Sequence, residues 1–208
     1  NLGLTFVGAG NITVNNNIAI GSGTVTTAGT GIVTFTVGNT YTGQTTVNAL
    51  STLSLSLAGS VSTSSKVDDE GTFDISSTSA GSSIKSLSGT TSAASVVLGM
   101  KTLTISNAND SFAGVISGTS GIVLTTGTET LSGANTYSGN TTLNGGTLII
   151  GGTGSLGYGF SSNNYRAPIS IATGALFEYS SSSNQTLSGL VSGLGGITKD
   201  TSSASTLT

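Results

Sequence analysis

Two ten-residue stretches of this chain are near copies of each other, and they restrict the fold more than any other feature. Asn39–Asn48 reads NTYTGQTTVN and Asn135–Asn144 reads NTYSGNTTLN, so seven of ten positions are identical at an offset of 96. A second pair, GVISGTSGI at 114–122 and GLVSGLGGI at 189–197, recurs at an offset of 75. Such repetition is typical of solenoids, in which each structural unit packs only against its neighbours. We therefore expect a stack of similar coils.

The apolar residues between the turns indicate the kind of coil. They occur in runs of about three to five residues and alternate with polar residues, which is the period of half-buried strands. Examples are Val33, Phe35 and Val37; Leu53, Leu55 and Leu57; and Leu148 and Ile150. No segment keeps a 3.6-residue period with caps, so no substantial α-helix is predicted.

The scarcity of charge favours a β-helix over a β-sandwich. Only 6% of the 208 residues are charged, and the outward positions of the predicted strands are mainly Thr and Ser. Equivalent side chains of a parallel β-helix stack about 4.8 Å apart. At that spacing like charges repel, whereas Thr and Ser can hydrogen-bond along the ladder. The sequence predicts an all-β parallel β-helix with about 20–25 residues per coil, about 8–10 coils and a rod roughly 40–50 Å tall.

The region around the second copy resembles a known repeat family. Residues 103–157, and within them LSGANTYSGNTTLNGGTL at 131–148, resemble the autotransporter-associated β-strand repeat of Gram-negative passenger domains. A weaker copy covers 4–57 and a truncated copy covers 187–208. The resemblance does not imply an activity, because function resides in sites and not in folds.

The resemblance does imply an architecture and a destination. It implies a right-handed, single-stranded β-solenoid that is exported across the outer membrane to the cell surface or secreted. Residues 1–208 would then be one continuous segment of a longer repetitive chain. The first copy departs from the family in NALSTLSLSLAGS, 48–60, where a Gly-rich turn is usual, which leaves the geometry of that coil open.

The composition argues against catalysis and against a cofactor. The chain has neither His nor Cys, which excludes a Ser–His–Asp triad and the common zinc sites. A Ser–Lys pair would have to use Lys66, Lys85, Lys101 or Lys199, and the eight acidic residues show no catalytic pairing. GTGSLG at 152–157 matches a dinucleotide motif, but no helix is predicted after it. Five basic residues against eight acidic ones give no electrostatic footprint for nucleic acid.

One stretch is unusual enough to be a candidate binding loop. YGFSSNNYRAP, at 158–168, contains two tyrosines, a phenylalanine, the sole arginine and the sole proline. Tyr and Arg are enriched at interface hot spots, so we select Tyr158, Phe160, Tyr165 and Arg166 as candidate contacts. The alternative is that the rings simply cover a rung of the core.

One acidic cluster is a weak calcium candidate. It comprises Asp68, Asp69, Glu70 and Asp74. Calcium prefers grouped carboxylates, but this spacing fits neither an EF-hand nor a nonapeptide β-roll repeat. A solvated turn is the favoured interpretation, and no metal site is predicted.

Six repeated positions are predicted to be structural. They are Asn39, Tyr41 and Gly43 of the first copy, with Asn135, Tyr137 and Gly139 of the second. Because they recur together, each tyrosine ring should fill a corner of the coil, with its hydroxyl at the edge. Each asparagine should lie at a turn, where the amides could stack.

These features together predict a non-catalytic structural or adhesive segment of an exported bacterial surface protein. A protein or receptor on a cell surface would be its partner. One alternative is a subunit of an extracellular fibre that assembles end to end, because neither terminus has the pattern of a cap. Another is a secreted ligand for a host-cell receptor that is bound through 158–168. The segment itself is not expected to be embedded in a membrane, because aromatic residues are only 5% and Trp is absent.

Overall fold

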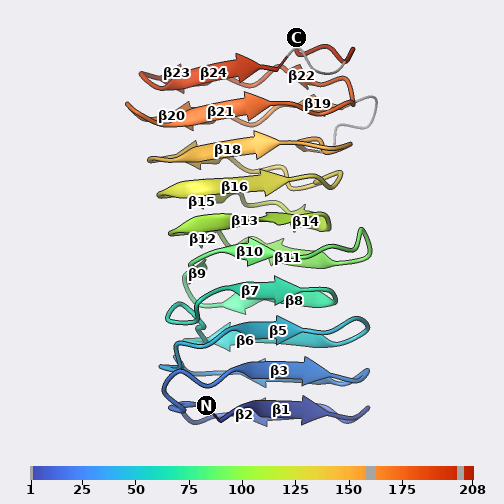
Figure 1. Cartoon of the computed structure of the whole chain (residues 1–208), viewed down its shortest axis with the longest axis vertical. Helices are drawn as coiled ribbons and strands as arrows, with labels where there is room; N and C mark the ends of the chain where they lie inside the picture. The colour runs from blue at the N-terminus through green and yellow to red at the C-terminus, as the bar shows by residue number, and fades with distance from the viewer. Residues whose placement is uncertain (1, 158–162, 201–203) are drawn as a thin grey trace.

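The chain folds into a stack of parallel strands. The computed structural model describes residues 2–157, 163–200 and 204–208, and it shows a β-solenoid of about ten turns with the chain ends at opposite ends of the stack (Figure 1). Every strand pair within these described ranges is parallel, and they contain no helix. The predicted all-β solenoid is therefore confirmed.

The strands form five sheets. Sheet 1 contains β1 (Leu4–Val7), β3 (Val25–Ala28), β5 (Thr45–Val47), β7 (Val67–Asp69) and β10 (Leu87–Ser88). Sheet 2 contains β2 (Ile12–Val14), β4 (Ile32–Phe35), β6 (Thr52–Leu57), β8 (Thr72–Thr78), β11 (Ser95–Gly99) and β14 (Val115–Gly118). Sheet 3 contains β9 (Ser82–Ile84), β12 (Leu103–Ile105), β15 (Ile122–Leu124), β17 (Thr141–Leu143), β20 (Ile169–Ile171) and β23 (Val191–Gly193). Sheet 4 contains β13 (Ala108–Phe112), β16 (Gly127–Leu131), β18 (Thr147–Ile150), β21 (Leu176–Tyr179) and β24 (Gly196–Lys199), and sheet 5 contains β19 (Asn164–Tyr165) and β22 (Thr186–Leu187).

The pairing register gives the length of each coil. Leu4 pairs with Val25, which is 21 positions further along the chain, and Ile122 pairs with Thr141, 19 positions further along. Both lengths are close to the predicted 20–25 residues. Thr141 pairs with Ile169, 28 positions further along, and this longer coil contains residues 158–162, which lie outside the described part.

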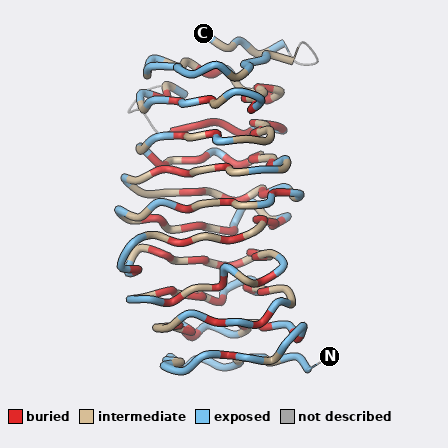
Figure 2. Tube along the Cα trace, turned by 90° about the vertical axis from the view of Figure 1, so that its left-hand side faces the viewer, coloured by how far each residue is buried: buried red, intermediate tan, exposed pale blue. Residues whose placement is uncertain are grey.

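The core fills the inside of the coils between Ile18 and Tyr179. Within β6, Leu53 and Leu55 are fully buried, whereas Thr52 and Ser54 between them are only partly buried. Figure 2 shows the same alternation of buried and less buried positions around each coil. Burying one such Leu or Phe side chain stabilises the fold by about 1.5–3 kcal/mol, and the period-2 pattern is what makes this burial possible.

The repeated strands occupy different faces of the rod in its two halves. By sequence β5 corresponds to β17, 96 positions later, yet β5 lies in sheet 1 and β17 in sheet 3. A bridge between Gly89 and Phe112 joins sheet 1 to sheet 4, so β5 shares its face with β18. The register steps are 20 positions from Val25 to Thr45, 22 from Thr45 to Val67 and 20 from Val67 to Leu87. The offset of 96 is therefore not a whole number of coils, and the second copy begins on another face.

The charged residues concentrate in the middle coils. Residues 66–129 hold 9 of the 13 charged residues, and residues 1–65 hold none. Ion pairs and buried charges are therefore features of the middle of the rod, whereas the first coils present only uncharged side chains.

The NALS turn, 48–51, keeps the geometry of the Gly-rich turn that it replaces. Leu50 has φ 67° and Gly146, its equivalent 96 positions later, has φ 74°. A residue with a Cβ is strained in this left-handed conformation by about 1–2 kcal/mol. The coil is thus preserved at the cost of local strain.

Replacing Leu50 by Gly should stabilise the protein. The Leu50 side chain is 82% exposed, so little burial is lost. Relief of strain should outweigh the higher chain entropy of Gly and raise the free energy of unfolding by about 0.5–1 kcal/mol. Urea unfolding followed by circular dichroism measures this change. The matched control is Gly146→Ala, where a Cβ would lie 2.2 Å from the carbonyl oxygen of Gly127 and should destabilise the fold. A destabilised Leu50→Gly variant would contradict the strain argument.

Candidate binding surface

The predicted binding loop divides between the core and the surface. Tyr158 and Phe160 lie outside the described residues. Tyr165 is only 1% exposed, and its ring packs edge-on against Tyr137 with the ring centroids 5.8 Å apart. Arg166 is exposed. The prediction that Tyr165 contacts a partner is therefore wrong, because its ring is buried against Tyr137 of the preceding coil, whereas Arg166 is exposed at the surface.

Tyr165→Phe should affect stability and Arg166→Ala should not. The Tyr165 hydroxyl donates to the carbonyl oxygen of Gly139 and lies 2.8 Å from the Thr141 hydroxyl. Removing it leaves buried acceptors without this donor, so we expect a loss of about 1–2 kcal/mol in the free energy of unfolding. Arg166→Ala should change it by less than about 0.5 kcal/mol. Thermal or urea unfolding of both variants tests the assignment, and equal losses would contradict it.

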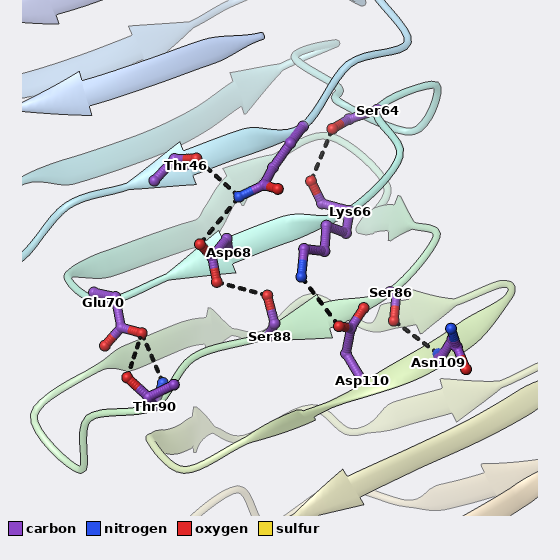
Figure 3. Close-up of polar contacts among 11 residues, drawn as sticks. Thr46, Ser64, Lys66, Asp68, Glu70, Ser86, Ser88, Thr90, Asn109 and Asp110 are labelled. Atoms are coloured by element: carbon purple, nitrogen blue, oxygen red, sulfur yellow. Dashed lines mark hydrogen bonds and ion pairs between the residues drawn. The ribbon is translucent and has the colours of Figure 1, made fainter.

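The acidic side chains of the weak calcium candidate, Asp68, Asp69, Glu70 and Asp74, are separated from one another by the alternation of the strands. The Asp68 carboxylate accepts hydrogen bonds from Gln44 at 3.0 Å and from Ser88 at 2.7 Å (Figure 3). Asp74 lies in β8, where it accepts the Ser76 amide at 2.8 Å. Among the described residues no three acidic, His or Cys side chains are grouped as a metal site.

Glu70 closes the turn after β7. Its carboxylate accepts the Thr90 amide at 2.7 Å, the Thr90 hydroxyl at 2.8 Å and the Thr91 amide at 3.0 Å (Figure 3). Slight burial raises the pKa of Glu70, but these hydrogen bonds outweigh it and leave the pKa below its usual value. Glu70 therefore fastens one coil to the next.

The repeated asparagines each tie three coils together. Asn135 is 1% exposed; its side-chain oxygen accepts the Ile116 amide at 3.0 Å, and its NH₂ group donates to Gly133 at 3.0 Å and Ser155 at 3.1 Å. Asn39 makes the equivalent three hydrogen bonds at 2.8 to 3.4 Å. Their partners are backbone groups of the same coil and of the two adjacent coils, so the amides do not stack on one another as predicted.

The repeated tyrosines fill the predicted corner but place their hydroxyls inside it. Tyr41 and Tyr137 are fully buried, and their hydroxyls lie 2.6 Å from Thr45 and 2.7 Å from Thr141. Burial raises the pKa of Tyr41 to about 12 and that of Tyr137 well above its usual value. The hydroxyls are therefore core hydrogen-bonding groups and not edge groups.

The repeated glycines let adjacent coils approach closely. A Cβ added to Gly43 would lie 2.2 Å from the carbonyl oxygen of Gly23, and one added to Gly139 would lie 2.3 Å from the carbonyl carbon of Ser120. Both distances are far below van der Waals contact. Any other residue at these positions would therefore push the coils apart.

Two buried carboxyl groups were missed by the sequence patterns. Asp69 and Glu129 are fully buried, and Glu129 occupies the position that Val33 has 96 residues earlier. Comparing the two copies position by position would have revealed an acid at a core position. Burial raises the pKa of Asp69 to about 7, against hydrogen bonds from the backbone of Gly71 and Phe73, and the charges of neighbouring acids add to the rise.

The pKa of Glu129 is raised further. Burial raises it well above its usual value, the nearby Leu87 amide offsets a part of this, and the Asp110 carboxylate adds to it. The Leu87 amide lies outside hydrogen-bonding geometry, because neither Glu129 oxygen has a hydrogen-bond partner among the described residues. Asp110 itself pairs with Lys66 at 3.1 Å (Figure 3).

Sheet 3 presents a row of outward side chains, five of which carry hydroxyl groups, and we call this row the hydroxyl stripe. Its members are the central residues of six strands, and each pairs with the next in register: Ser83, Thr104, Val123, Thr142, Ser170 and Ser192. Val123 is the one interruption. Neighbouring members lie about 4.8 Å apart along the rod, as strands of one sheet do.

A shallow hollow lies beside the hydroxyl stripe. Its volume is about 350 Å³, and its lining includes Thr102, Ser120, Asn140 and Thr142. Hydroxyl and amide groups can donate and accept hydrogen bonds, but they supply no general acid or base at neutral pH. The arrangement suits recognition of a polar surface.

Comparison with known proteins identifies the repeats. The sequence matches the passenger-associated-transport-repeat family twice, at residues 25–49 and 126–150. No curated protein and no solved structure gives a significant match. Within the described residues, no helix is long and apolar enough to cross a membrane. Two copies of this repeat, set in a parallel β-solenoid of about ten turns, are consistent with a segment of an autotransporter passenger domain.

Proposed function

We propose that this segment is a non-catalytic rod of a surface-exposed or secreted bacterial protein, and that it adheres through the hydroxyl stripe. The repeat family implies export to the cell surface or secretion. The observation that carries the adhesive part is the register of the stripe, in which five of six successive strands of one sheet place a hydroxyl at the same position. A row of similar weak donors and acceptors can bind a repetitive polar surface with an avidity that no single contact provides.

A pair of charge insertions tests the proposal. In the full-length passenger displayed on bacteria, Thr104→Lys combined with Thr142→Lys places two charges on the hydroxyl stripe. The matched control, Thr13→Lys combined with Ser54→Lys, places the same charges at outward positions of sheet 2. Adhesion to cells or to a coated surface should fall at least about tenfold for the stripe pair and should persist for the control pair, because only the first removes the repeated contacts. Unchanged adhesion of the stripe pair, with normal folding by circular dichroism, would contradict the adhesive role.

End-to-end association is the second candidate. It rests on the apolar side chains of the last described strands, where Leu190 is 70% exposed and Leu194 is 85% exposed, because either a further coil of the same chain or a second copy would cover them. Apolar side chains beside strand edges are a template for association. Fibres seen by negative-stain microscopy of the purified protein would favour this candidate, and isolated short rods would count against it.

A further inference from the structure

Glu129 is an acid built into the core of a sheet. In β16, Thr128 is exposed and Thr130 half-buried, whereas Glu129 between them is 0% exposed. Neither of its carboxyl oxygens has a hydrogen-bond partner among the described residues. An ionised carboxylate without a partner is far more costly to bury than a neutral carboxylic acid, so this site favours the protonated form.

The charges around Glu129 reinforce this preference. Its register neighbour on β13 is Asp110, whose carboxylate is already paired with Lys66 at 3.1 Å. Its neighbour on β18 is Leu148, and the strands on the other faces of these coils, β14, β15 and β17, contain no charged residue. Tyr137, the titratable group of the adjoining corner, is buried and neutral. A negative charge on Glu129 would therefore face a second carboxylate with no free cation to balance it.

Asp69 repeats the arrangement three coils away on the same face. It is also 0% exposed; one carboxyl oxygen accepts the Gly71 amide at 3.1 Å, and the other has no partner among the described residues. The charged groups near it are Asp68 and Glu70 of its own turn, both acidic. The neighbouring strands β5 and β10 contain no titratable residue. Asp74, on β8, is turned to its own local hydrogen bond with Ser76.

We propose that Asp69 and Glu129 bind protons in the folded rod, so that the middle coils become more stable as the pH falls and less stable as it rises. Each carboxyl group takes up a proton when the coils close around it. Loss of the proton leaves an unbalanced charge inside a coil, and the coil must open to hydrate it. Both sites lie in the middle coils, so the effect is confined to that part of the rod.

The direction of the pH dependence follows from linkage. An acid with a raised pKa in the folded state makes that state bind more protons than the unfolded state, so its contribution to stability is full below the unfolded pKa. For Asp69 that contribution is lost as the pH rises from about 3.8 to about 7. For Glu129 the loss begins near pH 4.5 and continues to a higher pH, because its pKa is raised well above that value.

Carbon-13 NMR of the side-chain carboxyl groups tests the proposal directly in the unmodified protein. Selective labelling of glutamate gives signals from Glu70, Glu129 and Glu178. One signal should keep the shift of a protonated carboxyl group at pH 7, and Glu129→Gln should remove that signal. Three ionised signals at pH 7 would overturn the assignment of Glu129, and the same experiment with labelled aspartate, read at pH 6, tests Asp69. A signal that moves on addition of calcium chloride at constant pH would identify a cation site instead and would also overturn the proposal.

Thermal unfolding tests the consequence for the rod. One proton taken up on folding changes the midpoint by about 3–5 °C per pH unit for a chain of this size. Between pH 5 and pH 9 the midpoint of the native protein should fall more steeply than that of Glu129→Gln, and the double variant with Asp69→Asn should be flattest. Glu178→Gln, which removes an acid from the same sheet, is the control and should retain the native slope. A double variant with the native slope would refute the proposal, and if that variant fails to fold, the NMR titration still decides.

Discussion

Asn135→Ala should lower the free energy of unfolding by about 3 kcal/mol. The substitution removes the acceptor of the Ile116 amide and the donors to Gly133 and Ser155, all inside the core. A buried backbone group that loses its partner costs about 1–3 kcal/mol, and here one side chain serves three coils. Urea unfolding followed by circular dichroism measures the change.

Two further variants make the Asn135 prediction specific. Asn135→Asp keeps the acceptor but sets a carboxylate against two carbonyl oxygens, so at pH 8 it should be more destabilising than Asn135→Ala. Asn17 donates to Gly38 from an exposed position, and Asn17→Ala should cost less than about 0.5 kcal/mol. Similar losses of stability for Asn135→Ala and Asn17→Ala would contradict the view that Asn135 holds adjacent coils together.

Tyr137→Ala should be the most damaging of the substitutions considered, with a loss of about 3–5 kcal/mol. The ring is fully buried, it packs edge-on against Tyr165, and its hydroxyl lies 2.7 Å from the Thr141 hydroxyl. The cavity left behind cannot collapse easily, because hydrogen-bonded coils on both sides fix its walls. The free energy of unfolding from urea titration is again the measurement.

Tyr137→Phe separates packing from hydrogen bonding. It keeps the ring and should lose only about 1 kcal/mol. Leu57 is 64% exposed, and Leu57→Ala serves as the control for loss of an apolar side chain at the surface. A Tyr137→Ala variant no less stable than Leu57→Ala would show that the corner can repack.

The sequence predicted the class of fold because its information is local and repeated. Alternation in segments such as Thr52–Leu57 determines which side chains face inward, and the copies at Asn39 and Asn135 mark equivalent corners. The same reasoning missed the rotation of the repeat between faces. That rotation depends on the exact length of each coil relative to the offset of 96, and short runs such as Ser82–Ile84 carry almost no apolar signal from which a coil could be delimited.

Prediction of individual side chains was less successful, for a physical reason. Tyr165 and Arg166 are neighbours in sequence, yet one lies in the core and the other at the surface, because strand alternation outweighs residue type. The four acids near Asp68 were grouped by sequence and are separated by the same alternation. Glu129 violates the rule that core positions are apolar, and only comparison with Val33 in the other copy would have exposed it.

The rotation of the repeat affects how a binding partner can reach its two copies. The two family matches, at 25–49 and 126–150, place their corresponding strands on different sides of one rod. A rigid bivalent molecule that recognises the outward side chains of the two copies could not approach both from one direction. The second copy therefore adds little avidity for a rigid binder, whereas a flexible or encircling partner could reach both. Two copies of one sequence thus present their equivalent side chains on two different faces of the rod.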